Sequence, residues 1–347
     1  MTRITRRQAL ALASGLAAAG RKAAAETRPV VALARVRNGA IDAAVEHAID
    51  LLGGIAALTR GKERIVLKPN LVSPDPSATT KPAVVRTLAR LLQGAHKDVS
   101  IAEGSAAAPG FNYRDGVSYR TSDPAILNGM QQRVFSDLGY TELAKQLRVP
   151  LINLHTGDLA EVKVPGAFVF EKLRIHRSLT ECDLLCSVPM MKTHVLAGVT
   201  LGMKNLVGVY PGAVYQALRG RMHDAASRVE PSGTASAVVD MVRANKLGLV
   251  VVDGSTAMEG NGPSGGPLLP MDLIVAGTNP LATDMVAAAA MGFAPEEIPT
   301  FAWANRAGLR PERLEEIEIR GEPLDRVRRK FVKPAIVPWS PAFAPAM

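Results

Sequence analysis

The strongest constraint on the fold is a repeated alternation of short apolar runs with segments of helical periodicity. Aliphatic runs at residues 30–36, 65–67 and 99–102 are separated by helical patterns at residues 41–58 and 80–92. Such runs are typical of strands buried on both faces, and strand–helix–strand repeats place successive strands parallel. We therefore predict an α/β fold with a mostly parallel open sheet and helices on both faces.

The rest of the chain continues this pattern and adds an insertion. Further apolar runs that predict strands occur at residues 151–154, 184–191, 249–252 and 273–276. Residues 162–179 alternate polar and apolar side chains, which predicts an antiparallel hairpin. Residues 109–135 are rich in Gly, Asn, Tyr and Asp and predict a long loop. We predict one α/β domain over residues 26–330, with the insertion at about 109–180, followed by a Pro-rich tail at 331–347.

The first 25 residues are typical of a twin-arginine (Tat) export signal. Arg6 and Arg7 precede a weakly apolar run at residues 9–20, and a cluster of alanines follows at 23–25. The apolar run is shorter than the roughly 20 residues that span a bilayer. We therefore predict passage through the Tat translocase and a periplasmic or otherwise exported location. An Ala-rich amphipathic N-terminal helix is the alternative.

The basic character of the chain comes partly from this segment. Of 41 Lys and Arg residues, 36 lie after residue 25, against 32 Asp and Glu residues, so the mature net charge is about +4. There is no long basic run, and aromatic residues make up only 4% of the chain. Binding to nucleic acid is therefore disfavoured. No later apolar stretch is long enough to predict a stable membrane span.

The two cysteines do not predict a metal centre. Cys182 and Cys186 are four residues apart, and along an extended strand they would lie roughly 13 Å from one another, too far for a disulfide. An iron–sulfur cluster or a zinc site needs more ligands at short spacing. Both cysteines are predicted to be core thiols, and an iron–sulfur cluster is not expected in this chain.

Polar residues that could carry chemistry follow the apolar run at residues 184–191. Lys192 and His194 come directly after it, and Lys204 follows ten residues later in a segment interrupted by glycines. Ligands of open α/β sheets bind beyond the carboxyl ends of the strands. We predict that Lys192 and Lys204 hold an anion there and that His194 exchanges a proton. Solvated loop residues are the alternative.

Other predicted strands also end in polar residues. Asp253 follows the run at residues 249–252, and Glu259 flanks a Gly-rich loop; this pair is predicted to bind a divalent cation or a second polar end of the ligand. The remaining residues predicted to bind ligand are Lys68, Asn70, Glu103, Asn205 and Asn261.

A purely structural explanation is available for two further groups of polar residues. Residues 210–230 include Arg219 and His223 and fit either a lid that supplies cations or a solvated charged face. Asp284 lies in the first turns of a predicted helix, where the helix dipole alone would favour a carboxylate.

Six strings in the sequence carry a family resemblance: VLKPNLV, AEGS, LLCSVPMMKTH, VTLGMKNLVGVYPG, VVVDGSTAMEGNGPSGG and AGTNPLATDMVAAAAMG. In this order they resemble the bacterial and archaeal family catalogued as domain of unknown function 362. Members often carry ferredoxin-like cysteine clusters or Tat signals, and this chain is similar to the exported kind without the cluster. The resemblance implies a redox partner or a metal cofactor nearby, and it supplies no established reaction.

Three functions fit these observations. The leading hypothesis is an exported enzyme that acts, with or without a metal, on a small carboxylate- or phosphate-bearing molecule. A periplasmic carrier that binds such a ligand or a metallocofactor without turnover needs the same converging polar groups. A partner of a redox complex would instead present a large apolar surface patch.

Replacing both Arg6 and Arg7 with lysine is expected to retain the protein in the cytoplasm with its N-terminus uncut, because lysine does not reproduce the geometry of the guanidinium pair. Cell fractionation and N-terminal mass spectrometry would measure this. Normal recovery of the double variant from the periplasm would remove the export prediction.

Overall fold

The computed structural model describes residues 28–231 and 233–347, and the predicted export signal at residues 1–25 lies outside them. Within the described residues, none of the helices combines the length and the apolar character needed to cross a bilayer.

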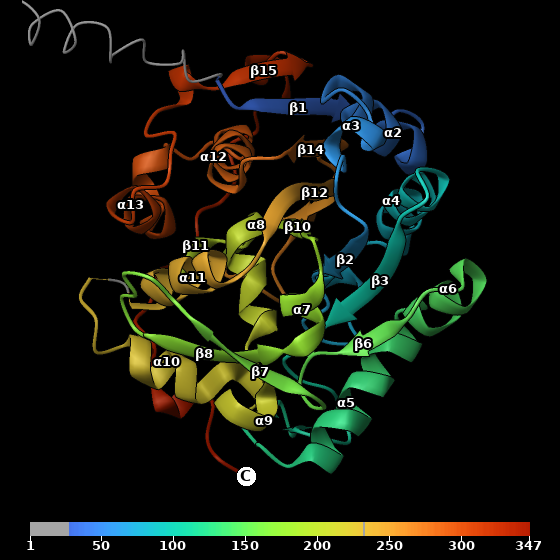
Figure 1. Ribbon diagram of the computed structural model, residues 1–347. Helices are drawn as coiled ribbons and strands as arrows, with labels where there is room; N and C mark the ends of the chain where they lie inside the picture. Colours follow the sequence, from blue (N-terminus) through green and yellow to red (C-terminus); the bar gives the residue numbers. More distant parts are fainter. Residues whose placement is uncertain (1–27, 232) are drawn as a thin grey trace, which may run out of the picture.

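An 11-stranded sheet forms the centre of the molecule (Figure 1). Its main path runs β15–β1–β14–β12–β9–β2–β3–β6, and β10, β11 and β13 lie near one end of β12. The bounds are β1 Val30–Arg35, β2 Arg64–Pro69, β3 Asp98–Glu103, β6 Leu151–Asn153, β9 Leu184–Val188, β10 Met190–His194, β11 Gly198–Val199, β12 Leu247–Met258, β13 Leu268–Leu269, β14 Leu273–Gly277 and β15 Glu318–Gly321.

Along the main path only β14 runs against its neighbours, pairing antiparallel with both β1 and β12. The prediction of a mostly parallel sheet is confirmed. The reversal at β14 has a local cause, since residues 259–272, all described, contain no helix. A parallel connection usually needs a crossover helix, whereas this connection folds back on the end of β12 through β13 and returns the chain antiparallel.

Helices cover both faces of the sheet, as predicted. Successive residues of β12 belong to different cores: Leu249 packs with one set of helices and Val250 with the other. One face carries α2 (Ile41–Leu51), α4 (Pro82–Gly94), α5 (Pro124–Asp137) and α6 (Tyr140–Leu147). The other carries α8 (Leu201–Lys204), α11 (Gly233–Ala244), α12 (Pro280–Ala290) and α13 (Pro299–Arg306), as Figure 1 shows. Shorter helices are α3 (Ile55–Leu58), α7 (Arg177–Glu181), α9 (Gly212–Tyr215), α10 (Gly220–Ala226) and α14 (Leu324–Val327).

The predicted hairpin is present as β7 (Leu159–Lys163) and β8 (Lys172–His176), an antiparallel pair outside the main sheet. The predicted loop at residues 109–135 is wrong in part, because it contains the short hairpin β4 (Tyr113–Arg114) and β5 (Val117–Ser118) and most of α5. The start of α5 had a readable signal: Asp123 caps the helix through the N–H of Ala125, and a proline follows it.

Two predicted elements are broken in the structure. The helix predicted at residues 41–58 ends early because Gly53 and Gly54 both adopt positive φ, 102° and 83°. The strand predicted at residues 184–191 is interrupted by Pro189, which has no N–H to donate to a sheet.

The break at Pro189 changes the position of the predicted site. Beyond it, β10 pairs with the far end of β12, with Met190 opposite Asp253. Lys192 and His194 therefore lie within a strand and are buried, so the alternative of solvated loop residues is wrong.

The two cysteines are free and buried, which confirms their prediction as core thiols.

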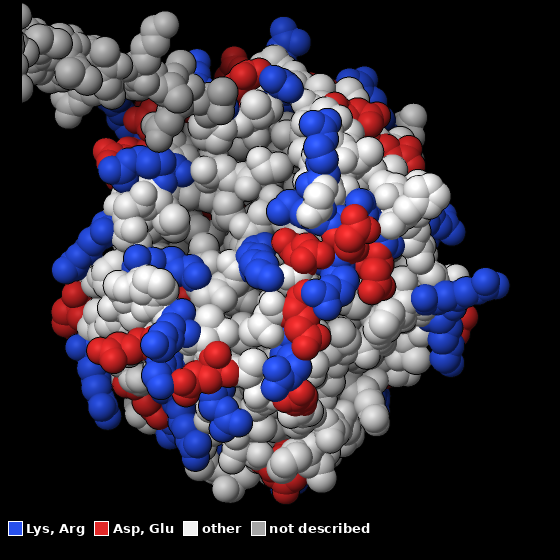
Figure 2. Space-filling view, viewed as in Figure 1, with Lys and Arg blue, Asp and Glu red and all other residues white. Residues whose placement is uncertain are grey.

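Basic and acidic side chains are interspersed on the face seen in Figure 2, so that face does not carry charge of one sign alone.

A buried carboxylate attaches the hairpin β7–β8 to α11. Asp240 is fully buried and accepts hydrogen bonds from the backbone N–H groups of three consecutive residues of the connection, Phe168, Val169 and Phe170, at 2.8, 2.7 and 3.0 Å. Replacing Asp240 with alanine removes all three bonds and leaves three donors without an acceptor.

We expect Asp240→Ala to lower the free energy of unfolding by at least about 1.5–3 kcal/mol, the cost of one charge-assisted hydrogen bond. Amide hydrogen exchange at residues 168–170 should accelerate more than exchange in β2 and β9. Exchange that rises equally in the hairpin connection and the central strands would contradict a local role.

Candidate functional site

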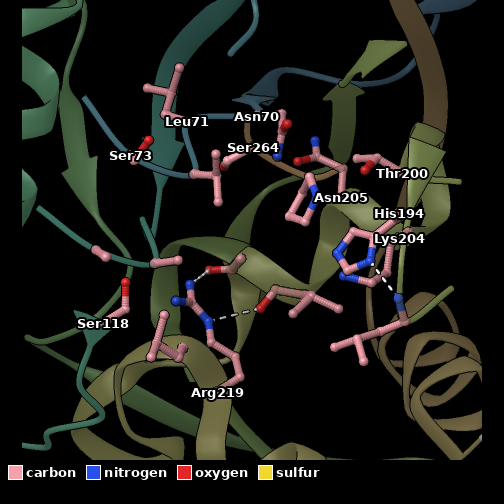
Figure 3. A pocket seen from close by; sticks show the side chains of 18 of the residues that line it. Asn70, Leu71, Ser73, Ser118, His194, Thr200, Lys204, Asn205, Arg219 and Ser264 are labelled. Atoms are coloured by element: carbon pink, nitrogen blue, oxygen red, sulfur yellow. Dashed lines mark hydrogen bonds between the residues drawn. The ribbon is translucent and has the colours of Figure 1, made fainter. Parts of the chain in front are cut away.

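A cavity of about 640 Å³ lies where the carboxyl ends of β2 and β3 meet β10 and α8 (Figure 3). Seven of the ten predicted site residues line it: Lys68, Asn70, Glu103, Lys192, His194, Lys204 and Asn205. Arg219, His223, Thr200 and part of the C-terminal tail line it as well. Segments far apart in the sequence therefore meet at one edge of the sheet, as the strand-end rule predicts.

A buried ion pair forms one side of the cavity. Lys68 Nζ lies 2.7 Å from Glu103 Oε1, and the two side chains are 0% and 2% exposed. Glu103 also accepts the N–H groups of Leu71 and Gly104, at 2.9 and 2.7 Å. A Cβ on Gly208 would lie 2.4 Å from Glu103 Oε1, so only glycine allows this segment to approach the pair so closely. Burial lowers the pKa of Lys68, although the Glu103 carboxylate opposes the shift.

All the donors of Lys68, and most of the acceptor positions of Glu103, are used inside the protein. Lys68 Nζ also donates to Asn205 Oδ1 and to the carbonyl of Pro69, at 3.2 and 3.1 Å, so all three of its N–H groups have partners. The Asn205 amide donates both its protons, to the Lys68 carbonyl and to Ser187 Oγ. Lys68, Glu103 and Asn205 therefore support the cavity and have little left to offer a ligand.

Arg219 contributes a buried positive charge that the sequence analysis left open between a lid and a solvated face. It is 2% exposed, and its guanidinium donates to the carbonyls of Gly104, Ser105, Val207 and Gly208. Four of its five N–H groups are thus used, and none of these bonds goes to a carboxylate. Burial lowers the pKa of Arg219 to about 10, so it remains charged at neutral pH.

Lys192 is fully buried and partly committed. Its Nζ donates to the carbonyls of Ala78 and Pro263, at 2.6 and 3.1 Å, which leaves one N–H for another acceptor. Burial, helped by the neighbouring Lys204 ammonium, lowers the pKa of Lys192 to about 7.

Lys204 differs from the other lysines of the cavity. It is 8% exposed, and no group in residues 28–231 or 233–347 forms a hydrogen bond or ion pair with its Nζ. Burial, together with the positive charges of Arg219 and Lys68, lowers the pKa of Lys204 to about 7. This ammonium group therefore points into the cavity with three unused N–H donors.

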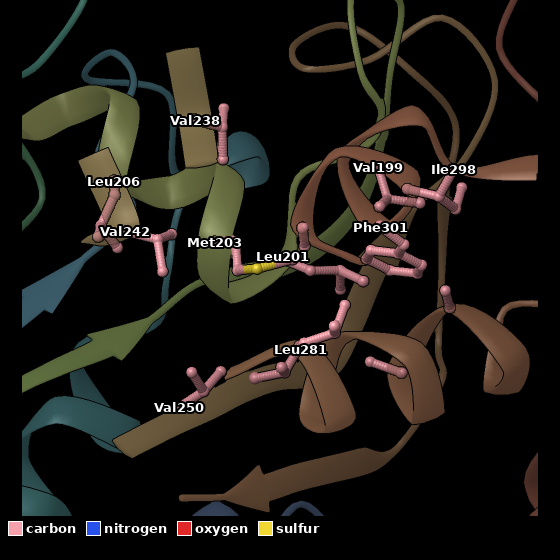
Figure 4. Close-up of a cluster of buried hydrophobic side chains, with 14 of the residues drawn as sticks. Val199, Leu201, Met203, Leu206, Val238, Val242, Val250, Leu281, Ile298 and Phe301 are labelled. Carbon is pink, nitrogen blue, oxygen red and sulfur yellow. The ribbon is translucent and has the colours of Figure 1, made fainter. Parts of the chain in front are cut away.

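The helix that carries Lys204 is firmly held. Leu201 and Met203 of α8 pack among side chains of β12, α12 and α13 (Figure 4). The carboxylate of Asp284 accepts the N–H groups of Gly202 and Met203 at 2.7 and 2.8 Å. Burial raises the pKa of Asp284 to about 7, against the effect of these bonds. The dipole of its own helix therefore explains the position of Asp284 only in part, because the Asp284 carboxylate also binds the start of α8.

His194 lines the cavity beside these lysines. Its Nδ1 accepts the N–H of Leu196 at 3.0 Å, drawn in Figure 3, so the neutral ring carries its proton on Nε2. Burial and the charges of Lys204 and Lys192 hold the pKa of His194 well below its usual range. At neutral pH the ring is thus uncharged and presents an N–H donor.

The cavity has an excess of positive charge. Four cationic side chains line it, Lys68, Lys192, Lys204 and Arg219, against two carboxylates, Asp75 and Glu103. Two buried oxygens, Asn70 Oδ1 and Thr200 Oγ1, also have no hydrogen-bond partner among the described residues. Unsatisfied polar atoms in a cavity indicate a place where a ligand supplies the missing partners.

The three remaining predicted residues do not line the cavity. Asp253 is buried and accepts the N–H of Lys81 at 2.9 Å and the hydroxyl of Ser255 at 2.6 Å. Glu259 and Asn261 accept N–H groups of the C-terminal tail. The described residues hold no cluster of three or more His, Cys, Asp or Glu side chains arranged for a metal ion. The side-chain oxygens of Asp253, Glu259 and Asn261 thus accept hydrogen bonds from other parts of the protein. The position of these residues near strand ends does not reveal those bonds.

The Pro-rich tail forms one wall of the cavity, which the sequence analysis missed. Val337, Trp339 and Phe343 line the cavity, and the N–H of Val337 donates to the Val195 carbonyl at 2.9 Å. The Trp339 ring stacks on His223 with centroids 4.3 Å apart, and its Nε1 donates to Asp224. The aromatic residues in an otherwise Pro-rich segment were the available signal.

Comparisons with known proteins place these residues in a wider context. A family model described as "Domain of unknown function (DUF362)" matches residues 65–289, which include every predicted site residue. The thylakoid-associated protein sll1697 of Synechocystis sp. is 27% identical over 280 residues, covering 80% of this chain and 78% of that protein.

Among solved structures, the lactate racemase apoprotein from Thermoanaerobacterium thermosaccharolyticum matches with a TM-score of 0.45 and 13% identity. The match covers 76% of this chain and 57% of that chain, so a large part of the racemase has no counterpart here. A similarity this distant does not establish a shared activity.

Two lysine-to-methionine variants should separate support from binding. Lys68→Met leaves the Glu103 charge buried without its partner and is expected to lower the free energy of unfolding by about 3–5 kcal/mol. Lys204→Met breaks no bond to any residue that the structure describes and should leave that free energy unchanged or higher. Urea unfolding at pH 7 measures both, and an equal loss in the two variants would contradict the assignment.

Proposed function

This chain belongs to the family described as Domain of unknown function (DUF362), as its motifs predicted, and we propose that its cavity binds a small carboxylate- or phosphate-bearing molecule and exchanges protons with it. The main support is the uneven use of the cationic donors. The cavity holds four cations and two carboxylates, and one of those cations, Lys204, has no internal partner among the described residues.

The unused donors indicate how an anion would be held. Lys204 offers three N–H groups and Lys192 offers one, while Arg219 adds a fixed positive charge. Each charge-assisted bond is worth about 1.5–3 kcal/mol, so a few such contacts are enough for specific binding.

Proton exchange belongs to the lysines in this proposal. Lys192 and Lys204 both have a pKa of about 7, which suits a group that gives or takes a proton near neutral pH. His194 is neutral there, and its Nε2–H serves as a hydrogen-bond donor to a developing negative charge. This shifts the predicted proton exchange from His194 to the two lysines.

We also propose that the protein works outside the cytoplasm and near a redox partner. The twin arginines at Arg6 and Arg7 support export, and the family resemblance supports the partner. A carrier without turnover would use the same cavity, and the His194→Gln variant separates the two functions. Native mass spectrometry of the protein purified from its own compartment would identify any retained molecule, and the variant can then be assayed with it.

Replacing Lys192 or Lys204 with methionine is expected to weaken binding of sulfate and of oxalate about 10- to 100-fold, the loss of one charge-assisted contact. Isothermal titration calorimetry at pH 6.5 measures the affinities, and Lys145→Met, an exposed lysine of α6, is the matched control. His194→Gln should largely retain the affinity and lower turnover of an identified substrate. Unchanged affinity in both cavity variants would end the anion-site proposal.

The affinity should also depend on pH in a defined direction. Because the pKa of Lys192 and of Lys204 is about 7 in the free protein, both are protonated below pH 7 and must take up protons to bind an anion above it. Binding of sulfate or oxalate, neither of which titrates near pH 7, should therefore be constant below pH 7. Above it the affinity should fall by up to about tenfold per pH unit for each lysine. Affinity that rises with pH would contradict the role of the lysines.

A further inference from the structure

The lysines of the cavity differ in how many internal partners they have. Lys68 Nζ has three partners, and Lys192 Nζ has two. Lys204 Nζ has none among the described residues, although the side chain is only 8% exposed. Its bonds to two carbonyls fix the position of the Lys192 amine, whereas the Lys204 amine, without such bonds among the described residues, is free to approach a ligand.

We propose that Lys204 forms an imine with the carbonyl group of an aldehyde or 2-oxo carboxylate bound in the cavity. This deepens the proposed function and rests on it, because it narrows the anionic ligand to one that carries a carbonyl group. Lysines in apolar surroundings or beside another cation are the ones that act as amine nucleophiles.

The position of the amine suits such a reaction. The helix α8 is fixed by the packing of Leu201 and Met203 and by the two bonds to Asp284. Because Lys204 ends this helix, its side chain extends from a rigid support into the cavity that Figure 3 shows. A nucleophile held by a rigid element needs little reorganisation to meet a bound carbonyl.

The neighbouring groups supply the other requirements. The positive charge of Arg219 suits the carboxylate of a 2-oxo acid, and the one remaining N–H of Lys192 is left as a proton donor. The Nε2–H of His194 suits the carbonyl oxygen, because it faces the cavity and has no partner among the described residues. With a pKa of about 7, roughly half of the Lys204 amines are neutral at pH 7, against about one in 2,500 for an ordinary lysine.

Imine formation at Lys204 releases one water molecule and takes one proton from Lys192. The neutral Lys204 amine adds to the carbonyl carbon, and one N–H proton moves to the oxygen, which gives a carbinolamine. The Lys192 ammonium then protonates the hydroxyl group, which leaves as water while the nitrogen lone pair forms the C=N bond. Lys192 becomes neutral and the imine carries the positive charge, so charge and protons are conserved.

Reductive trapping with glyoxylate and sodium cyanoborohydride at pH 7 tests the proposal on the full chain. Hydride from the reductant converts the imine into a stable secondary amine, which peptide mass spectrometry locates. We expect Lys204 to be modified at least about tenfold faster than the exposed Lys145 of the same molecule, as the larger neutral fraction requires. Excess sulfate should slow the reaction at Lys204 and leave Lys145 unaffected.

Two variants show whether the fast modification occurs at Lys204. Lys204→Arg keeps a positive charge but cannot be deprotonated, so it should remove the fast modification, whereas Lys145→Met should retain it. Modification of Lys204 no faster than that of Lys145 would overturn the proposal. Sulfate binding without a Lys204 adduct overturns the imine and leaves the anion site intact. A fast Lys204 adduct without sulfate or oxalate binding overturns the anion site and keeps the nucleophile.

Discussion

The buried ion pair between Lys68 and Glu103 is the interaction on which the rest of the site depends. It joins the ends of two neighbouring strands, and Asn205 bonds to the same lysine and so attaches the segment after α8 to the sheet. Burying two charges is costly unless every lone pair and proton is satisfied, and here all three Lys68 protons have partners. The pair therefore fixes the cavity wall and adds no net charge to it.

The positive charge of the cavity comes from the cationic side chains outside this pair, Lys192, Lys204 and Arg219. Arg219 is satisfied by backbone carbonyls, and Lys192 is satisfied in part, so their charges face the cavity without a carboxylate of their own. Lys204 has no internal partner among the described residues. The low dielectric that makes an unpaired ammonium costly also lowers its pKa to about 7. An unpaired buried ammonium costs some stability, and such a compromise is common at functional sites.

A central segment and the C-terminal tail complete the enclosure of the cavity. Pro189 ends β9 and directs β10 towards the far end of β12, which carries Lys192 and His194 into the interior. Glu259 and Asn261 bind N–H groups of the C-terminal tail, and the tail places Trp339 against His223 at the cavity. Glu259 and Asn261 therefore hold the tail that lines the cavity, although neither lines the cavity itself.

The elements that depend on local patterns could be read from the sequence. Strands buried on both faces are continuous apolar runs, and five of the seven predicted residues that line the cavity, Lys68, Asn70, Glu103, Lys192 and His194, were found because they follow such runs. The choice of partners could not be read, because it joins distant residues: Lys192 bonds to Ala78, 114 positions away, and Glu259 to Val332, 73 positions away. Since the same residue types serve as support or as ligand contacts, only the tertiary structure shows that Lys68 is paired and that Lys204 has no internal partner among the described residues.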